Sequence, residues 1–177
     1  MAARSLRIAS DFRLPLEAIT QTLAILAKRG AGKTYTAKVL AEELLAAALP
    51  LVVLDPVGVW WGLRAGADGS PDGGYPITIL GGDHGDLPLE VDAGATIADL
   101  VVDERVSVVL DLSSFRKGES RRFVTSFAER LYHRNREALH VIVDEADAFA
   151  PQRSPKGDEA RLLGAMEDLV RRGRARG

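Results

Sequence analysis

The residues best suited to chemistry lie in the run from Ala27 to Thr34. An apolar run at residues 23–26 precedes them, and residues 35–48 favour a helix. This order predicts a strand that enters a glycine-containing turn, whose N–H groups converge on an anion at the positive end of the helix dipole. Lys33 is then expected to reach the β- and γ-phosphates of a nucleotide, and the Thr34 hydroxyl is expected to bind Mg2+.

One position departs from the phosphate-loop pattern G-x-x-x-x-G-K-[ST], because Ala27 stands where the first glycine is expected. Alanine is tolerated wherever φ is negative, whereas Gly30 and Gly32 are expected where φ is positive or a ligand lies close. An ordinary strand-to-helix turn with a surface lysine is the alternative, but the flanking strand and helix patterns favour the phosphate loop. We therefore predict that the nucleotide is bound by Arg29, Gly30, Ala31, Gly32, Lys33, Thr34 and Tyr35.

A second acidic motif follows the apolar run at residues 139–143, where Asp144 and Glu145 stand side by side. Asp144 is expected to hold Mg2+ through its water shell, and Glu145 to orient and deprotonate the attacking water. Taken alone, such an ending is equally typical of a helix N-cap or a solvated turn. Together with the phosphate loop, it predicts a site for magnesium and a nucleoside triphosphate.

The composition limits what else the chain can do. Its 177 residues, 46% hydrophobic and 27% charged, predict one folded domain over residues 1–177, with residues 1–21 as a lead-in. No apolar run approaches the roughly 18 to 20 residues that cross a bilayer, so we expect a cytoplasmic protein without a membrane partner. The chain has no cysteine, which excludes disulfides, thiol nucleophiles and thiolate zinc sites.

Hydrophobic patterning divides the chain into alternating strands and helices. Apolar runs without alternation predict strands buried on both faces, and they occur at residues 22–26, 51–54, 77–80, 106–110 and 139–143. Helices are expected at residues 33–49, 93–101, 119–135 and 159–172. The predicted fold class is therefore α/β, with a mostly parallel sheet flanked by helices.

Two groups of arginines and a tryptophan pair leave alternatives open. The formal net charge is −2, so the molecule as a whole has no field that favours nucleic acid. Trp60 and Trp61 form either a hydrophobic plug or a platform on which bases stack. The arginines form either solvated helix faces or contacts to phosphates or partners, and they are Arg121, Arg122, Arg130, Arg134 and Arg136, followed by Arg171, Arg172, Arg174 and Arg176.

The chain resembles the central ATPase domain of the HerA-like and FtsK-like P-loop translocases, which have a RecA-like fold. The resemblance rests on residues 23–34, 52–60, 81–89, 141–151 and 167–174. It implies a homo-hexameric ring that hydrolyses ATP with Mg2+ to move double-stranded DNA, commonly beside a nuclease.

The resemblance also implies roles for individual residues. It gives Lys33 and Thr34 the phosphate and metal contacts, Asp144 the metal, Glu145 the catalytic base and Asp55 a supporting acidic role near the water. It implies an arginine supplied by the neighbouring subunit, for which the candidates are Arg171, Arg172, Arg174 and Arg176. Family members continue into a strand ending in Thr-Gln that senses the γ-phosphate, so this chain is expected to be C-terminally incomplete relative to the family.

Three functions remain compatible with these motifs. They are a DNA-translocating ATPase, a nucleotide-binding switch or scaffold without productive hydrolysis, and a kinase that acts on a small molecule. The placement of Glu145 next to Asp144 favours activating water over positioning a substrate hydroxyl.

Overall fold

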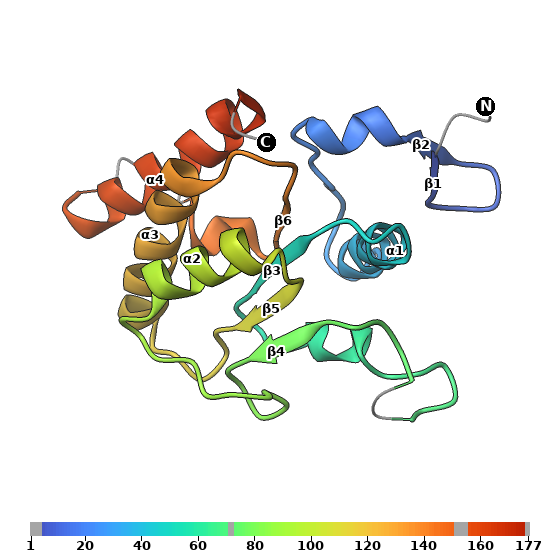
Figure 1. Cartoon of the computed structure of the whole chain (residues 1–177), viewed down its shortest axis with the longest axis horizontal. Coiled ribbons are helices and arrows are strands. Elements are labelled where there is room, and N and C mark those ends of the chain that lie inside the picture. Colours follow the sequence, from blue (N-terminus) through green and yellow to red (C-terminus); the bar gives the residue numbers. More distant parts are fainter. Residues whose placement is uncertain (1–4, 71–72, 151–155, 176–177) are drawn as a thin grey trace.

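The computed structural model describes residues 5–70, 73–150 and 156–175 (Figure 1). Its central sheet has four parallel strands in the order β4-β5-β3-β6. These strands are β3 (Leu51–Asp55), β4 (Thr78–Leu80), β5 (Val108–Asp111) and β6 (His140–Val143). Because all four are parallel, their carboxyl ends meet at one edge of the sheet, where ligands bind in open α/β folds.

In the part of the chain that the structure describes, four α-helices flank this sheet. They are α1 (Lys33–Ala46), α2 (Gly94–Glu104), α3 (Lys117–Arg134) and α4 (Asp158–Arg172). Helix α1 covers one face of the sheet, and α2, α3 and α4 gather on the other (Figure 1). The predicted α/β class with a mostly parallel sheet, as in RecA-like P-loop proteins, is confirmed. None of the described helices combines the length and the apolar character needed to span a membrane.

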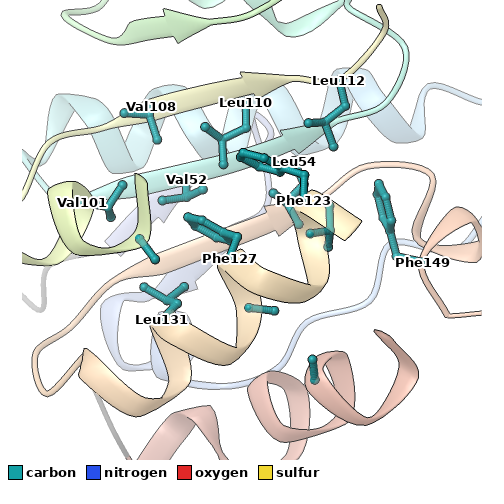
Figure 2. Packing of buried hydrophobic residues seen from close by; sticks show 14 of the residues in the cluster. Val52, Leu54, Val101, Val108, Leu110, Leu112, Phe123, Phe127, Leu131 and Phe149 are labelled. Carbon is teal, nitrogen blue, oxygen red and sulfur yellow. The ribbon is translucent and has the colours of Figure 1, made fainter. Parts of the chain in front are cut away.

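Strand β3 is buried on both faces, since successive residues of a strand point in opposite directions. Val52 and Leu54 join the core that α2, α3 and α4 share, where Phe127 of α3 packs (Figure 2). Leu51 and Val53 belong to the second core, which lies against α1. This double burial explains the continuous apolar run in the sequence of this strand.

The lead-in residues form a small unit of their own. Strands β1 (Ser5–Arg7) and β2 (Arg13–Pro15) pair antiparallel, and the short 3-10 helix η1 (Leu16–Thr20) follows them. The backbone N–H of Arg7 donates a hydrogen bond of 2.6 Å to Glu43 Oε2 of α1. The hairpin therefore packs on α1 and stays separate from the parallel sheet.

The prediction of a core strand at residues 22–26 is wrong. This segment has no regular secondary structure, and Leu26 is 89% exposed. The Thr22 hydroxyl instead donates a hydrogen bond of 2.8 Å to the carbonyl oxygen of Val170, near the end of α4. An apolar run becomes a buried strand only beside a neighbouring strand, and within the described residues the sheet ends at β6, which pairs with β3 alone. The other predicted strands and helices are present, with bounds shifted by a few residues.

Candidate nucleotide-binding site

A glycine-containing turn leads into α1, as the sequence predicts. Gly30 has φ of 76° and Gly32 has φ of 86°, whereas Ala27 is not among the residues with positive φ. The positive φ at the two glycines is confirmed, and it explains why a side chain is tolerated at the first position of the motif but not at these two. Gly32 is also the N-cap of α1, and no side chain caps this helix.

The start of α1 fits a phosphate group. The first N–H groups of a helix have no partner within it, and here the capping residue offers no side chain to accept them. A Cβ atom added at Gly30 would meet nothing within 4 Å, so the space above the turn is open. Lys33 and Thr34 are the first two residues of α1 and are partly exposed, while Tyr35 is 74% exposed. The turn thus combines backbone donors, a cation and a hydroxyl.

Asp144 and Glu145 follow β6 at the carboxyl edge of the sheet. Asp144 is partly buried, and its Oδ1 accepts the backbone N–H of Glu145 at 3.0 Å. Glu145 is exposed and has φ of 45°, a strained backbone conformation for a residue with a side chain and one that is frequent at functional sites. Among the described residues, no hydrogen bond or ion pair joins this acidic pair to Lys33 or Thr34, and no group of three acidic or histidine side chains is arranged around a metal position.

Trp60 connects α1 to Asp144. Its indole Nε1 donates a hydrogen bond of 2.8 Å to Asp144 Oδ2, and the side chain is 0% exposed. Lys38 of α1 donates to the carbonyl oxygen of Val59 at 2.6 Å, and its Nζ lies 5.9 Å from the centre of the Trp60 ring system. The plug interpretation holds for Trp60, while Trp61 is 36% exposed and stacks on His84 with ring centroids 4.0 Å apart.

The polar contact of Trp60 is the part of the site that sequence reasoning missed. A buried indole N–H must find an acceptor, and the acidic residues at the ends of neighbouring parallel strands are the available ones. This rule, applied to the tryptophan after β3, could have pointed to Asp144.

Asp55 is buried at the end of β3 and accepts hydrogen bonds from the turn that follows. Its side chain is 0% exposed. Its Oδ1 accepts the backbone N–H groups of Val57 and Gly58 at 3.0 and 2.8 Å, and its Oδ2 accepts that of Trp60 at 2.8 Å. Burial raises the pKa of Asp55 above its usual value, although these three N–H donors act to lower it. The geometry therefore assigns Asp55 to holding the turn after β3 and does not support a contact with a catalytic water.

Four arginines of α3 form ion pairs with acidic residues of the same chain. Three of them form ion pairs with acidic residues on or just before α2, at N–O distances of 2.5 to 2.8 Å: Arg122 with Asp92, Arg130 with Asp99 and Arg134 with Asp103. Arg121 pairs with Glu159 of α4 at 2.6 Å. These contacts favour the interpretation as a solvated, ion-paired helix face over a surface reserved for phosphates.

The terminal arginines also have local partners. Arg171 pairs with Glu167 at 3.4 Å and Arg172 with Asp168 at 2.8 Å, both one helical turn back along α4. The guanidinium of Arg174 donates to Gln21 Oε1 at 3.2 Å, and Arg176 lies outside the described residues. A contribution of any of them to a neighbouring subunit stays a prediction.

Residues 7–70 match the family model of the helicase HerA central domain. The matched stretch contains the glycine turn, α1, β3 and Trp60, and it ends before Asp144 and Glu145. This match supports assigning the chain to the HerA-like P-loop ATPases. The comparisons with curated proteins and with solved structures gave no match.

Proposed function

We propose, from this family assignment, that the chain binds Mg-ATP at the turn from Gly30 to Thr34 and hydrolyses it to drive movement on double-stranded DNA. The observation that carries the proposal is the conformation of this turn. Two glycines with positive φ deliver the backbone to the uncapped start of a 14-residue helix whose first two residues are Lys33 and Thr34. That combination of donors at a helix start suits a polyphosphate.

The residues of the chain divide the work by their chemistry. The N–H groups of the turn and Lys33 would bind phosphate oxygens, while the Thr34 hydroxyl and the Asp144 carboxylate supply the hard oxygen ligands that Mg2+ prefers. When bound, Mg2+ would neutralise charge on the transferred phosphoryl group. The exposed Glu145 would accept the proton of the attacking water.

Movement on DNA and assembly into a ring rest on the family alone. A homo-oligomeric ring would allow one of Arg171, Arg172, Arg174 or Arg176 to complete a neighbouring site, and a nuclease would act beside it. The ion pairs of the α3 arginines do not add support for DNA contact on that helix, because their charges are already balanced by carboxylates on or just before α2.

A nucleotide-binding switch without productive hydrolysis is the second candidate, and one observation favours it. The segment that leads into the turn lies outside the parallel sheet, and in the described residues no hydrogen bond or ion pair joins Lys33 or Thr34 to the acidic pair after β6. Hydrolysis requires the catalytic base to be held close to the bound phosphates, whereas nucleotide binding does not, so this separation favours binding without hydrolysis.

Calorimetry with ATP and Mg2+ tests the site. The Lys33→Ala variant should lose about 10- to 100-fold in affinity, as expected for a lost hydrogen bond to a charged group. Lys28→Ala is the matched control, because Lys28 is an exposed lysine five residues earlier in the chain and we assign it no role. Equal affinity of the wild type and Lys33→Ala would overturn the proposal.

Hydrolysis separates the two candidates. Glu145→Gln should bind ATP as tightly as the wild type and hydrolyse it about 10²- to 10⁴-fold more slowly, because only the proton acceptor is removed. A wild-type protein that binds Mg-ATP but shows no turnover, with or without double-stranded DNA, would instead favour the switch.

A further inference from the structure

The backbone around Trp60 is held by two hydrogen bonds, and its side chain is completely buried. The carboxylate of Asp55, which is itself buried, accepts the backbone N–H of Trp60 at 2.8 Å. Lys38 holds the preceding carbonyl group from α1, with its ammonium group 5.9 Å from the indole. The ring itself is completely buried in the core that lies against α1. An indole held in this way has little freedom to rotate, so the direction of its N–H bond is set by the fold.

The indole N–H of Trp60 donates its hydrogen bond to Asp144. The Asp144 carboxylate receives one hydrogen bond on each oxygen, from Trp60 Nε1 at 2.8 Å and from the N–H of Glu145 at 3.0 Å. Each carboxylate oxygen can accept more than one hydrogen bond, so both keep capacity for a ligand. The two donors therefore fix the plane of the carboxylate and leave both oxygens able to bind a ligand.

The hydrogen bond between Trp60 and Asp144 links the turn after β3 to the acidic pair after β6. Trp60 lies 84 residues before Asp144 in the chain and belongs to the turn after β3, which Lys38 ties to the same helix that begins with Lys33 and Thr34. In the described residues, this is the path of hydrogen bonds that runs from α1 to the acidic pair. Partners of metal-binding carboxylates commonly set the orientation of those ligands and tune metal affinity.

We infer that Trp60 is a positioning residue, whose indole N–H orients the Asp144 carboxylate for Mg2+ at the nucleotide turn. This inference rests on the proposed function, since it concerns the same site. Trp60 need not touch the nucleotide: its contribution is to hold the Asp144 ligand in one orientation before the metal arrives. Removal of the N–H should therefore change the requirement for Mg2+ more than the affinity for the nucleotide itself.

The Trp60→Phe variant keeps an aromatic ring and removes the donor, and Trp61→Phe is the matched control on the neighbouring, partly exposed tryptophan. Binding of a fluorescent ATP analogue is measured as Mg2+ is titrated, and again in EDTA. Trp60→Phe should raise the Mg2+ concentration at half-saturation about 10-fold, with unchanged binding in EDTA and an unchanged titration for Trp61→Phe. Adding Trp60→Phe to Asp144→Ala should have no further effect, because the acceptor of the indole N–H is already removed.

A second measurement does not need a substituted Trp60. The chain has two tryptophans, so a nitrogen-15 spectrum shows two indole N–H signals, and Trp61→Phe identifies the one from Trp60. That signal should shift on addition of Mg-ATP and in Asp144→Asn, while Asp83→Asn in an exposed loop leaves it in place.

The outcomes distinguish the two proposals. Absence of Mg2+-dependent nucleotide binding in the wild type would overturn the proposed function. Two results would overturn the role of Trp60 alone, provided that the wild type binds normally. One is identical Mg2+ titrations for both tryptophan variants, and the other is an indole signal that does not shift in Asp144→Asn.

Discussion

Asp55 and Asp111 lie directly beside each other at the carboxyl ends of β3 and β5, and both side chains are buried. Burial raises the pKa of Asp55, and the nearby negative charge of Asp111 adds to the increase. The folded protein thus holds the Asp55 proton more tightly than the unfolded chain does. The stability that Asp55 contributes is therefore fully present below its unfolded pKa and is lost as the pH rises through its folded pKa.

The Asp111→Asn substitution should reduce this loss, because it removes the neighbouring negative charge and keeps an oxygen for the Ser113 N–H, which Asp111 Oδ1 now accepts at 2.9 Å. The free energy of unfolding of Asp111→Asn, relative to the wild type, should rise as the pH increases from the usual pKa of an aspartate through the raised pKa of Asp55. Urea unfolding at several pH values measures it, with Asp83→Asn as an exposed control. If the difference in free energy of unfolding between Asp111→Asn and the wild type does not vary with pH, the charge interaction between Asp111 and Asp55 is contradicted.

The glycine turn allows a paired test of the phosphate loop. Gly32→Ala should destabilise the fold by about 1 to 2 kcal/mol, because alanine is strained at a φ of 86°, and it should weaken Mg-ATP binding as the turn shifts. Ala27→Gly completes the motif at a position without positive φ and should leave the ATP affinity unchanged. Unfolding and calorimetry of both variants measure this. A large gain in affinity for Ala27→Gly would show that a glycine conformation is needed at that position.

The ion-paired face of α3 makes a prediction about DNA. Arg130 donates two hydrogen bonds to the Asp99 carboxylate, at 2.8 and 2.9 Å, so its charge is already compensated. Binding of double-stranded DNA, followed by fluorescence anisotropy, should weaken steeply with salt in the wild type and in Arg130→Gln alike. If Arg130→Gln lowered the slope of the salt dependence by about one, Arg130 would be a phosphate contact, against our expectation.

The helices and most strands were predictable because the cause of each element is local. Phe123, Phe127 and Leu131 recur at intervals of four residues, and all three point from α3 into one core (Figure 2). Strand β3 is covered on both faces, so its burial is visible as an unbroken apolar run. The turn at Gly30 and Gly32 was likewise predictable from residue type.

The errors concern relationships between distant residues. Residues 22–26 are as apolar as a core strand, but a strand also needs a partner, and the sheet described here gives them none. A role of Asp55 near a catalytic water stays a prediction, and its three hydrogen bonds to the turn that follows are a feature that residue type alone does not reveal. The bond between Trp60 and Asp144 joins positions 84 residues apart. Local patterns carry no direct information on such pairings.

Strand β6 makes the last prediction, because it lies at the end of the sheet. The N–H of His140 donates to Pro50 and that of Asp144 to Leu54, at 3.0 and 3.1 Å, so these two residues face β3. Since the direction of the N–H groups alternates along a strand, Ile142 also faces β3, while the N–H groups of Val141 and Val143 point to the outer edge.

Within the described residues no strand pairs with that outer edge, so the amide hydrogens of Val141 and Val143 should exchange with solvent more than about 10-fold faster than that of Ile142. Hydrogen exchange followed by NMR measures this, and β3 provides the control, because its position between β5 and β6 should make all its amides slow. The amides of residues 23–26 should be fast as well, since this segment is exposed. Slow exchange at Val141 and Val143 in a dilute, monomeric sample would contradict an open edge. Slow exchange that appears only as the protein concentration rises would show that a second copy covers the edge by strand pairing.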